Sequence, residues 1–184
     1  ALPLVEPSAG EDYAQFLHFM SLVDKYRTMA VRANADTAVD AAKARSFGAE
    51  GIGLFRLEHM FYGEGSAKPL FLLRKMILCV TQADRIAVLK DLFPYMKHDI
   101  KGAMEAMDGL PVTIRLLDPP LHEFLPHSQL GRQEISQALG IAEEEVRKRV
   151  DALQESNPMM GHRGVRLSVT YPEITEYQAL AVFE

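Results

Sequence analysis

The stretch PVTIRLLD, residues 111–118, decides the expected fold. β-Branched residues follow one another in it and two prolines close it directly afterwards, a combination that predicts a short strand. Helical spacing of apolar residues precedes it over residues 81–107, with a break expected at Pro94, and helical spacing returns after residue 131. A strand set between two helical regions indicates a βα unit.

The same order of strand and helix occurs upstream. GIGLF at residues 51–55 is a second short apolar run, and TMAVRANAD at residues 28–36 is a β-prone stretch that ends in polar residues. Between them, residues 37–48 have alanine-rich helical spacing that ends near a glycine. The remaining expected elements are a packed helix over 12–27, helices over 70–78, 132–139 and 143–155, a fourth strand over 165–169 and a final helix.

Strands separated by helices favour parallel βα units, so the expected fold class is α/β. Three or four units cannot close an eight-stranded barrel, and the expected architecture is therefore an open sheet or a partial (β/α)8 TIM barrel, with parallel strands alternating with helices. Residues 1–11 carry two prolines and are expected to form a linker from an upstream domain. Residues 12–184 are expected to be part of one domain, truncated because the final helical pattern has no stop signal.

Composition and charge limit the classes of function. A formal net charge of -5 and a pI of about 5.7 give no overall attraction to nucleic acid or to an anionic membrane, so any anion site must be local. No apolar run approaches the roughly 20 residues needed to cross a bilayer. The single cysteine, Cys79, excludes an internal disulfide and is compatible with a reducing compartment. An intracellular protein is expected.

Three arginines occur near the expected strand ends. Arg56 follows GIGLF, Arg115 lies inside VTIR, and Arg163 precedes the expected fourth strand. Residues at the carboxyl ends of strands share one site in βα folds, and guanidinium groups match phosphate and carboxylate oxygens with paired hydrogen bonds. A pocket for a small di- or trianion is therefore expected. Taken singly, each arginine is more often a solvated residue or an ion-pair partner, although an arginine inside a short apolar strand requires an anionic partner.

Three longer motifs carry a resemblance to a known family. GAEGIGLFRLEHMF at 48–61, GLPVTIRLLDPPLHEFLP at 109–126 and NPMMGHRGVRLSVTYPEI at 157–174 together resemble the barrel of the pyruvate phosphate dikinase family, which uses phosphoenolpyruvate (PEP). VRANADT at 31–37 resembles the segment that opens that barrel. The resemblance extends from about residue 12 to the last residue, and its LDPPLHEF motif is far more specific than a glycine pattern.

The resemblance implies that Arg56, Arg115 and Arg163 contact PEP or pyruvate and neutralise charge on the phosphoryl group. It implies the conversion of ATP, pyruvate and phosphate into AMP, PEP and diphosphate. The phosphoryl group would pass through a phosphohistidine on a swivelling domain, and a nucleotide-binding domain would belong to the same full-length chain. A homodimer is expected for the full-length protein. The compartment implied is the cytoplasm or a plastid- or peroxisome-like organelle such as the glycosome.

Other parts of the family's site have no counterpart in this sequence. The ligands of Mg²⁺ and the acid/base cysteine are expected beyond Glu184, so no catalytic or metal-binding residue is assigned here. The chain alone is therefore expected to be inactive and to bind PEP weakly. The alternatives that stay open are PEP synthase, Enzyme I of the sugar phosphotransferase system, and a non-catalytic anion-binding or assembly module.

Several other residues bear on the site. Leu57 stands where the family usually has Thr, which puts a hydroxyl contact or a local hydrogen bond in doubt but not the role of the neighbouring guanidinium group. His122 and Glu123 could form an acid/base pair or bind a metal, but a structural role is preferred. Asn34 and Asp36 are expected to cap the next helix, with a carboxylate at the barrel mouth as the alternative for Asp36.

The last candidates are expected to be structural. His162 is expected to pack or to orient the neighbouring arginine. The nine methionines, including Met159 and Met160, are expected to fill the core. Cys79 is expected to be a buried small hydrophobe, and it does not match the family's catalytic cysteine.

Overall fold

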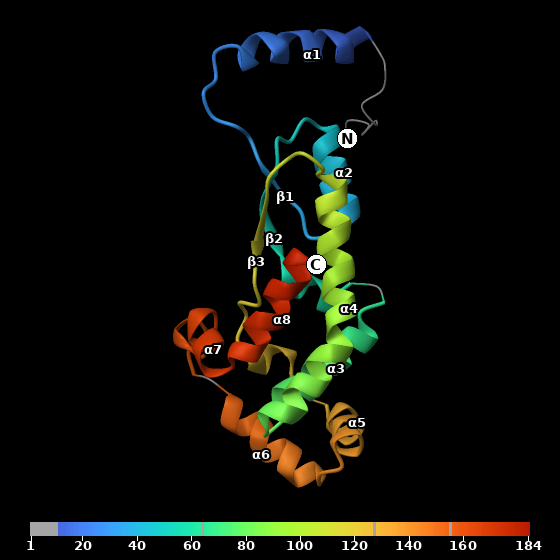
Figure 1. Ribbon diagram of the computed structural model, residues 1–184, viewed down its shortest axis with the longest axis vertical. Coiled ribbons are helices and arrows are strands. Elements are labelled where there is room, and N and C mark those ends of the chain that lie inside the picture. The colour runs from blue at the N-terminus through green and yellow to red at the C-terminus, as the bar shows by residue number, and fades with distance from the viewer. Residues whose placement is uncertain (1–10, 64, 127, 155) are drawn as a thin grey trace. The chain divides into compact units, whose positions relative to one another are not determined.

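The computed structural model describes residues 11–63, 65–126, 128–154 and 156–184 (Figure 1). It divides into two units, Ala1–Val31 and Arg32–Glu184. Most of the expected linker, residues 1–11, lies outside the described residues. The assignment of residues 12–184 to one domain stays a prediction.

The first unit contains helix α1, Glu11–Asp24, which confirms the helix expected there. The expectation that this helix is packed is not met, because none of the described residues of α1 is buried. Phe16 and Phe19, on its apolar face, are both exposed. The spacing correctly predicted an apolar helical face, but none of the described residues of the first unit, 11–31, is buried.

The second unit is built on an open parallel sheet. Among the described residues the strands are β1 (Ala33–Asn34), β2 (Ile52–Arg56) and β3 (Val112–Arg115), in the order β1-β2-β3. Both strand pairs are parallel, and helices alternate with the strands along the chain, as predicted. This α/β arrangement is consistent with part of a TIM barrel.

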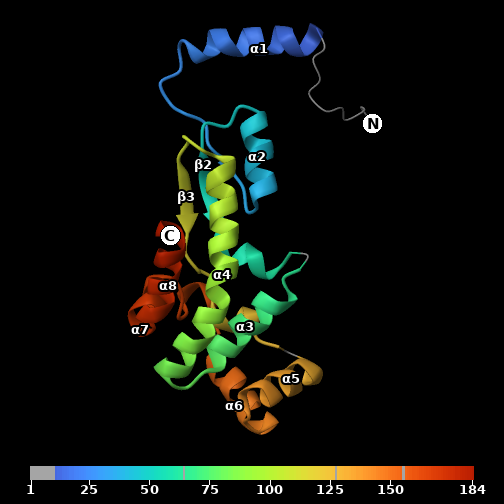
Figure 2. The ribbon, with the colours of Figure 1, turned by 45° about the vertical axis from the view of Figure 1, so that its right-hand side comes forward.

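Helices lie on one side of the sheet and extend beyond it (Figures 1 and 2). The longest, α4, packs against α2, α3 and α8 and is the central helix of the second unit. The helices of this unit are α2 (Ala38–Ser46), α3 (Ala67–Leu78), α4 (Gln82–Ala106), α5 (Gln129–Leu139), α6 (Glu143–Leu153), α7 (Val165–Thr170) and α8 (Pro172–Phe183). Short 3-10 helices are η1 (Leu57–Phe61), η2 (Leu121–Phe124) and η3 (Pro158–Met160).

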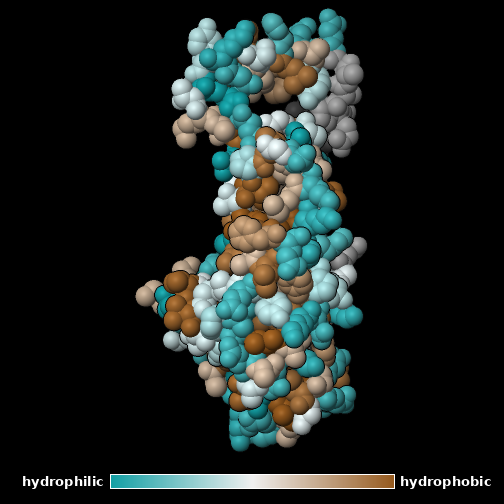
Figure 3. Space-filling model, in the orientation of Figure 1, coloured by the Kyte–Doolittle hydropathy of each residue, from teal (hydrophilic) through white to brown (hydrophobic). Residues whose placement is uncertain are grey.

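The fourth strand expected over residues 165–169 is wrong. These residues form helix α7, which begins after Gly164 and buries only Leu167 among its described residues. Val165 and Val169 are both exposed, and Figure 3 shows apolar surface over α7. β-Branched side chains favour a strand only where a neighbouring strand and a buried face receive them, and the described residues offer neither here.

The break expected at Pro94 is also wrong. Helix α4 continues through it from Gln82 to Ala106. Proline removes one backbone hydrogen bond and costs about 3 kcal/mol in a helix interior. Packing against three other helices opposes that cost over the length of α4. Pro69 lies in the first turn of α3, where a missing N–H is tolerated.

The core lies between the sheet and the helices. Its largest fully buried side chains include Ile52 and Phe55 from β2 and Leu89 and Leu92 from α4. The prediction for the methionines is confirmed for three that are buried, Met76, Met96 and Met107. It is wrong for four that are exposed, Met29, Met104, Met159 and Met160. Within the described ranges, every helix is too short or too polar to span a membrane.

Candidate functional site

The carboxyl ends of the strands bring two of the predicted arginines together. Arg56 is the last residue of β2 and Arg115 is the last residue of β3, and the two are register partners. Register partners on parallel strands lie about 5 Å apart and project to the same face of the sheet. The two guanidinium groups therefore start from neighbouring positions on one edge.

Arg56 is held by Asp36, which follows β1. One carboxylate oxygen of Asp36 accepts from the backbone N–H of Arg56 at 3.2 Å and from its Nε at 3.0 Å. The other oxygen lies 3.1 Å from Nδ1 of His59. The capping role expected for Asn34 and Asp36 is wrong, because Thr37 caps α2 with its hydroxyl oxygen. The alternative for Asp36, a carboxylate at the strand ends, describes its position.

Arg115 lies between two carboxylates. Its Nη2 donates to Oε1 of Glu58, and its Nη1 lies 3.5 Å from Oδ2 of Asp118. Glu58 is almost fully buried, at 2% exposure, so its charge depends on Arg115 for compensation. Among the described residues, the second oxygen of Glu58 and the Nε of Arg115 are buried and have no hydrogen-bond partner.

Arg163 joins the other arginines through Asp118. Its Nε donates to the backbone oxygen of Asp118 at 3.0 Å, and its Nη2 donates to Oδ2 at 2.8 Å. The hydrogen bond that Arg163 donates to the Asp118 carboxylate raises the pKa of Arg163. Gly164 has φ +56°, and a Cβ there would lie 3.3 Å from the Asp118 carboxylate. Glycine thus lets the chain pass close to the carboxylate that joins Arg115 to Arg163.

We call this set of residues the arginine rim: the three arginines Arg56, Arg115 and Arg163 with the carboxylates Asp36, Glu58 and Asp118. Sequence reasoning did not single out Glu58 or Asp118. Both had a usable signal, because an arginine in a short apolar strand needs an anionic partner. Glu58 follows one strand end by two residues and Asp118 follows the other by three, so that requirement pointed to them.

Leu57 contributes no polar group to the rim. Its side chain is buried, and it lines a small apolar cavity with Leu73, Met76 and other core residues. The residue after Arg56 therefore belongs to the hydrophobic core. A hydroxyl at this position would face apolar side chains.

The other histidine candidates have structural surroundings. His122 and Glu123 lie on η2, which Arg74 holds by donating from Nε to the backbone oxygen of Phe124 at 2.6 Å. His162 has its Nε2 2.8 Å from the hydroxyl of Thr170 and its ring against Tyr171. It packs on α7, which is the first of its two expected roles. In the part of the chain that the structure describes, no three His, Cys, Asp or Glu residues cluster to hold a metal.

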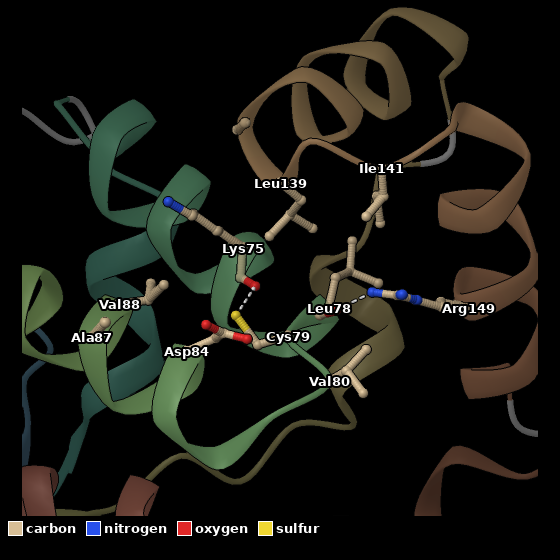
Figure 4. A pocket seen from close by; sticks show the side chains of 11 residues that line it. Lys75, Leu78, Cys79, Val80, Asp84, Ala87, Val88, Leu139, Ile141 and Arg149 are labelled. Atoms are coloured by element: carbon tan, nitrogen blue, oxygen red, sulfur yellow. Dashed lines mark hydrogen bonds between the residues drawn. The ribbon is translucent and has the colours of Figure 1, made fainter.

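A separate cavity of about 320 Å³ lies between α3, α4, α5 and α6 (Figure 4). Its lining is largely aliphatic, and none of the rim arginines is among its lining residues. Cys79 lines it and donates from its thiol to the backbone oxygen of Lys75 at 3.2 Å. Burial raises the pKa of this thiol and keeps it protonated, which disfavours a nucleophilic role. The prediction that Cys79 is a buried small hydrophobe is confirmed.

Comparison with known proteins supports the resemblance drawn from the motifs. Residues 11–184 match the family described as PEP-utilising enzyme, PEP-binding domain. Pyruvate, phosphate dikinase 1, chloroplastic, of Arabidopsis thaliana is 54% identical over 168 residues, which are 90% of this chain and 17% of that protein. Pyruvate, phosphate dikinase of Rhizobium meliloti (strain 1021) is 48% identical over 183 residues, which are 100% of this chain and 20% of that protein.

A third relative, pyruvate, phosphate dikinase of Clostridium symbiosum, is 46% identical over 180 residues, which cover 98% of this chain and 20% of that protein. The chain thus spans no more than a fifth of the length of these relatives. The family match, in contrast, extends over almost the whole chain. The chain therefore belongs to the PEP-utilising enzymes, as part of a PEP-binding domain of the pyruvate, phosphate dikinase type.

Proposed function

We propose that the arginine rim binds PEP and pyruvate. The observation that carries the proposal is the convergence of Arg115 and Arg163 on Asp118, next to Arg56 in the sheet. The three arginine side chains are 26% to 37% exposed, so each keeps surface for an incoming anion. PEP carries a phosphoryl group and a carboxylate, which are the two groups that guanidinium forks match best.

The carboxylates of the rim would hold the arginines in place before a ligand arrives. Asp36, Glu58 and Asp118 each contact one or two of them. An arginine that is already oriented loses less side-chain entropy when it binds an anion. During phosphoryl transfer the fixed guanidinium groups would oppose the negative charge on the moving phosphoryl group.

The reaction proposed for the complete protein is the one that the resemblance to the dikinase family implies. ATP, pyruvate and phosphate would give AMP, PEP and diphosphate, with a phosphohistidine on a separate swivelling domain and a nucleotide-binding domain in the same protein. We also propose that the full-length protein is an intracellular homodimer. PEP synthase and Enzyme I are less favoured, because the relatives described above are all named pyruvate, phosphate dikinase. Phosphate dependence of PEP formation by the full-length protein separates these enzymes.

In this proposal Mg²⁺ is bound by residues of the full-length protein beyond Glu184. The described residues gather no cluster of metal ligands, and the rim carboxylates already contact arginines. These residues therefore do not fit a Mg²⁺ site. For the same reason the 184 residues alone are expected to show no PEP-forming turnover.

The test of the rim is stabilisation of the chain by ligand. The melting temperature is measured with PEP, pyruvate and inorganic phosphate, for the unchanged chain and for Arg56→Ala and Arg115→Ala. Each variant is compared with its own ligand-free value, since loss of Arg115 also leaves Glu58 without its partner. Arg147→Ala is the matched control, because Arg147 is an exposed arginine paired with Glu144 on α6. The proposal fails if PEP stabilises no form, or stabilises the rim variants as much as the control.

A further inference from the structure

The backbone N–H of Leu117 needs a partner beyond the sheet. Leu117 is buried and lies two residues after Arg115, where β3 has already ended. A buried N–H without a partner costs about 1–3 kcal/mol. The side chain of Gln178, from α8, fills this need, since its Oε1 accepts from the Leu117 N–H at 2.7 Å.

Both ends of the Gln178 amide are engaged. The residue is 3% exposed, and its Nε2 donates to the backbone oxygen of Ile174, one turn earlier in α8, at 3.2 Å. A backbone N–H can only donate and a carbonyl can only accept, so these two partners fix which end of the amide faces Leu117. The side chain therefore has one orientation that satisfies all its neighbours.

Helix α8 is a firm support for this side chain. Glu173, in its first turn, forms a buried ion pair with Arg85 of α4. Tyr177 packs edge-on against Phe93 of the same helix, with ring centroids 6.0 Å apart. Gln178 follows Tyr177 directly, so the contacts of Tyr177 and Glu173 with α4 also hold the backbone of Gln178 in place.

We infer that Gln178 is a positioning residue for the arginine rim. Its hydrogen bond fixes Leu117, and the next residue, Asp118, carries the carboxylate that contacts Arg115 and the backbone and side-chain oxygens that bind Arg163. A shift of Leu117 towards water would move Asp118 and separate the two arginines. The inference rests on the proposed function of the rim, which it extends to a buried residue of the last helix.

Two variants of Gln178 separate positioning from general stability. Gln178→Met keeps a similar volume but removes both the acceptor and the donor. Gln178→Glu, whose buried carboxyl group stays protonated because burial without a cation raises its pKa, keeps an oxygen that can accept from Leu117 and a hydroxyl that can donate to Ile174. Ile174→Val is the matched control, because it removes one buried methyl group from α8 and leaves both hydrogen bonds of Gln178 intact. The readouts are the affinity for PEP, hydrogen exchange of the Leu117 amide, and the NMR resonance of the Arg163 Nε–H.

Gln178→Met is expected to weaken PEP binding about tenfold, to speed exchange at Leu117 by a similar factor and to shift the Arg163 resonance. Gln178→Glu is expected to restore most of the PEP affinity, and Ile174→Val to lower stability with PEP affinity unchanged. The inference is overturned if Gln178→Met leaves the Leu117 and Arg163 signals unchanged, or if Ile174→Val weakens PEP binding equally. The two NMR readouts need no ligand, so they judge this inference even if the unchanged chain fails to bind PEP and the proposed function falls.

Discussion

The molecule contains arginine–carboxylate pairs in two very different settings. At the rim, the side chains of Arg56, Arg115 and Arg163 are 32%, 37% and 26% exposed. In the helical core, Arg85 is 8% exposed and its partner Glu173 is 3% exposed. Arg85 also donates to the backbone oxygen of Cys79 at 3.0 Å and lies over the ring of Tyr171. The core pair is fully enclosed, whereas the rim pairs keep a face open to solvent.

Arginine–carboxylate pairs therefore have different roles in the two settings. A buried pair holds two helices in register, and breaking it leaves an uncompensated charge inside the protein. A half-exposed pair adds little to stability, because water competes for both partners. Arg56 and Arg163 can therefore change partners at small cost, which is the property that a binding site for anions requires, whereas Arg115 must stay with the buried Glu58.

The largest expected effect comes from breaking the core pair. Arg85→Met leaves Glu173 buried without its cation and is expected to lower the free energy of unfolding by about 3–5 kcal/mol. Arg56→Met, at the rim, is expected to lower it by less than about 1 kcal/mol. Urea unfolding of both variants measures the difference. Equal losses would show that burial does not distinguish the two settings.

The second largest effect is expected at acid pH, which should weaken the core pair of Arg85 and Glu173. Burial raises the pKa of Glu173, but the hydrogen bond from Arg85 and further interactions outweigh burial and bring the pKa below its ordinary value of 4.5. The contribution of this carboxylate to stability is therefore complete above the ordinary value and is lost as the pH falls through the lowered folded value. Urea unfolding across acid pH should show a steeper loss for the unchanged chain than for Glu173→Gln. Parallel curves would contradict the assignment.

Glu58→Gln sharpens the comparison at a residue that belongs to both settings. The carboxylate is buried like Glu173, but its partner Arg115 is partly exposed. Glutamine keeps an acceptor for Arg115 and removes the negative charge, so the free energy of unfolding should fall by about 1 kcal/mol. PEP affinity should rise about threefold to tenfold, because one repelling charge has gone. Titration of PEP checks this, with Glu144→Gln on α6 as a control that should change neither quantity.

The smallest expected change in stability belongs to Arg56→Lys. Lysine keeps the charge opposite Asp36 but loses the planar fork, so stability should change by less than about 0.5 kcal/mol. Stabilisation by PEP should nevertheless decrease, because an ammonium group cannot bind a phosphoryl group and hold Asp36 in the same geometry. A melting curve with and without PEP measures both effects. Unchanged stabilisation by PEP would show that Arg56 does not take part in binding PEP.

The strands of the fold were predictable where the sequence signal was local and strong. The runs around Phe55 and Ile114 combine β-branched or apolar residues with clear ends, and both form strands. VRLSV has the same local composition but becomes a helix, because no strand lies beside it among the described residues. Pro94 failed as a break for a related reason: packing on three sides supports α4. Local propensity gave way to tertiary contacts in both cases.

For the site, the sequence allowed the arginines to be predicted but not their acidic partners. Arginines in apolar surroundings are visible in a sequence, and the strand ends bring Arg56 and Arg115 together as register partners. Their acidic partners were harder to find, because burial of Glu58 and the contact of Asp118 with Arg163 arise only from the folded chain. Gln178 had no signal of its own, since it is an ordinary polar residue in a helix until Leu117 is seen to need an acceptor.

The carboxylates of the rim lead to selectivity by competition. A singly charged anion such as chloride must displace an acid that is tethered next to each arginine at high effective concentration, and it offers no stronger attraction in return. A small molecule that bears a phosphoryl group and a carboxylate can meet two or three guanidinium groups at once. In the proposed site, the acidic side chains of the rim would therefore favour such a ligand over the abundant monovalent salts of the cell.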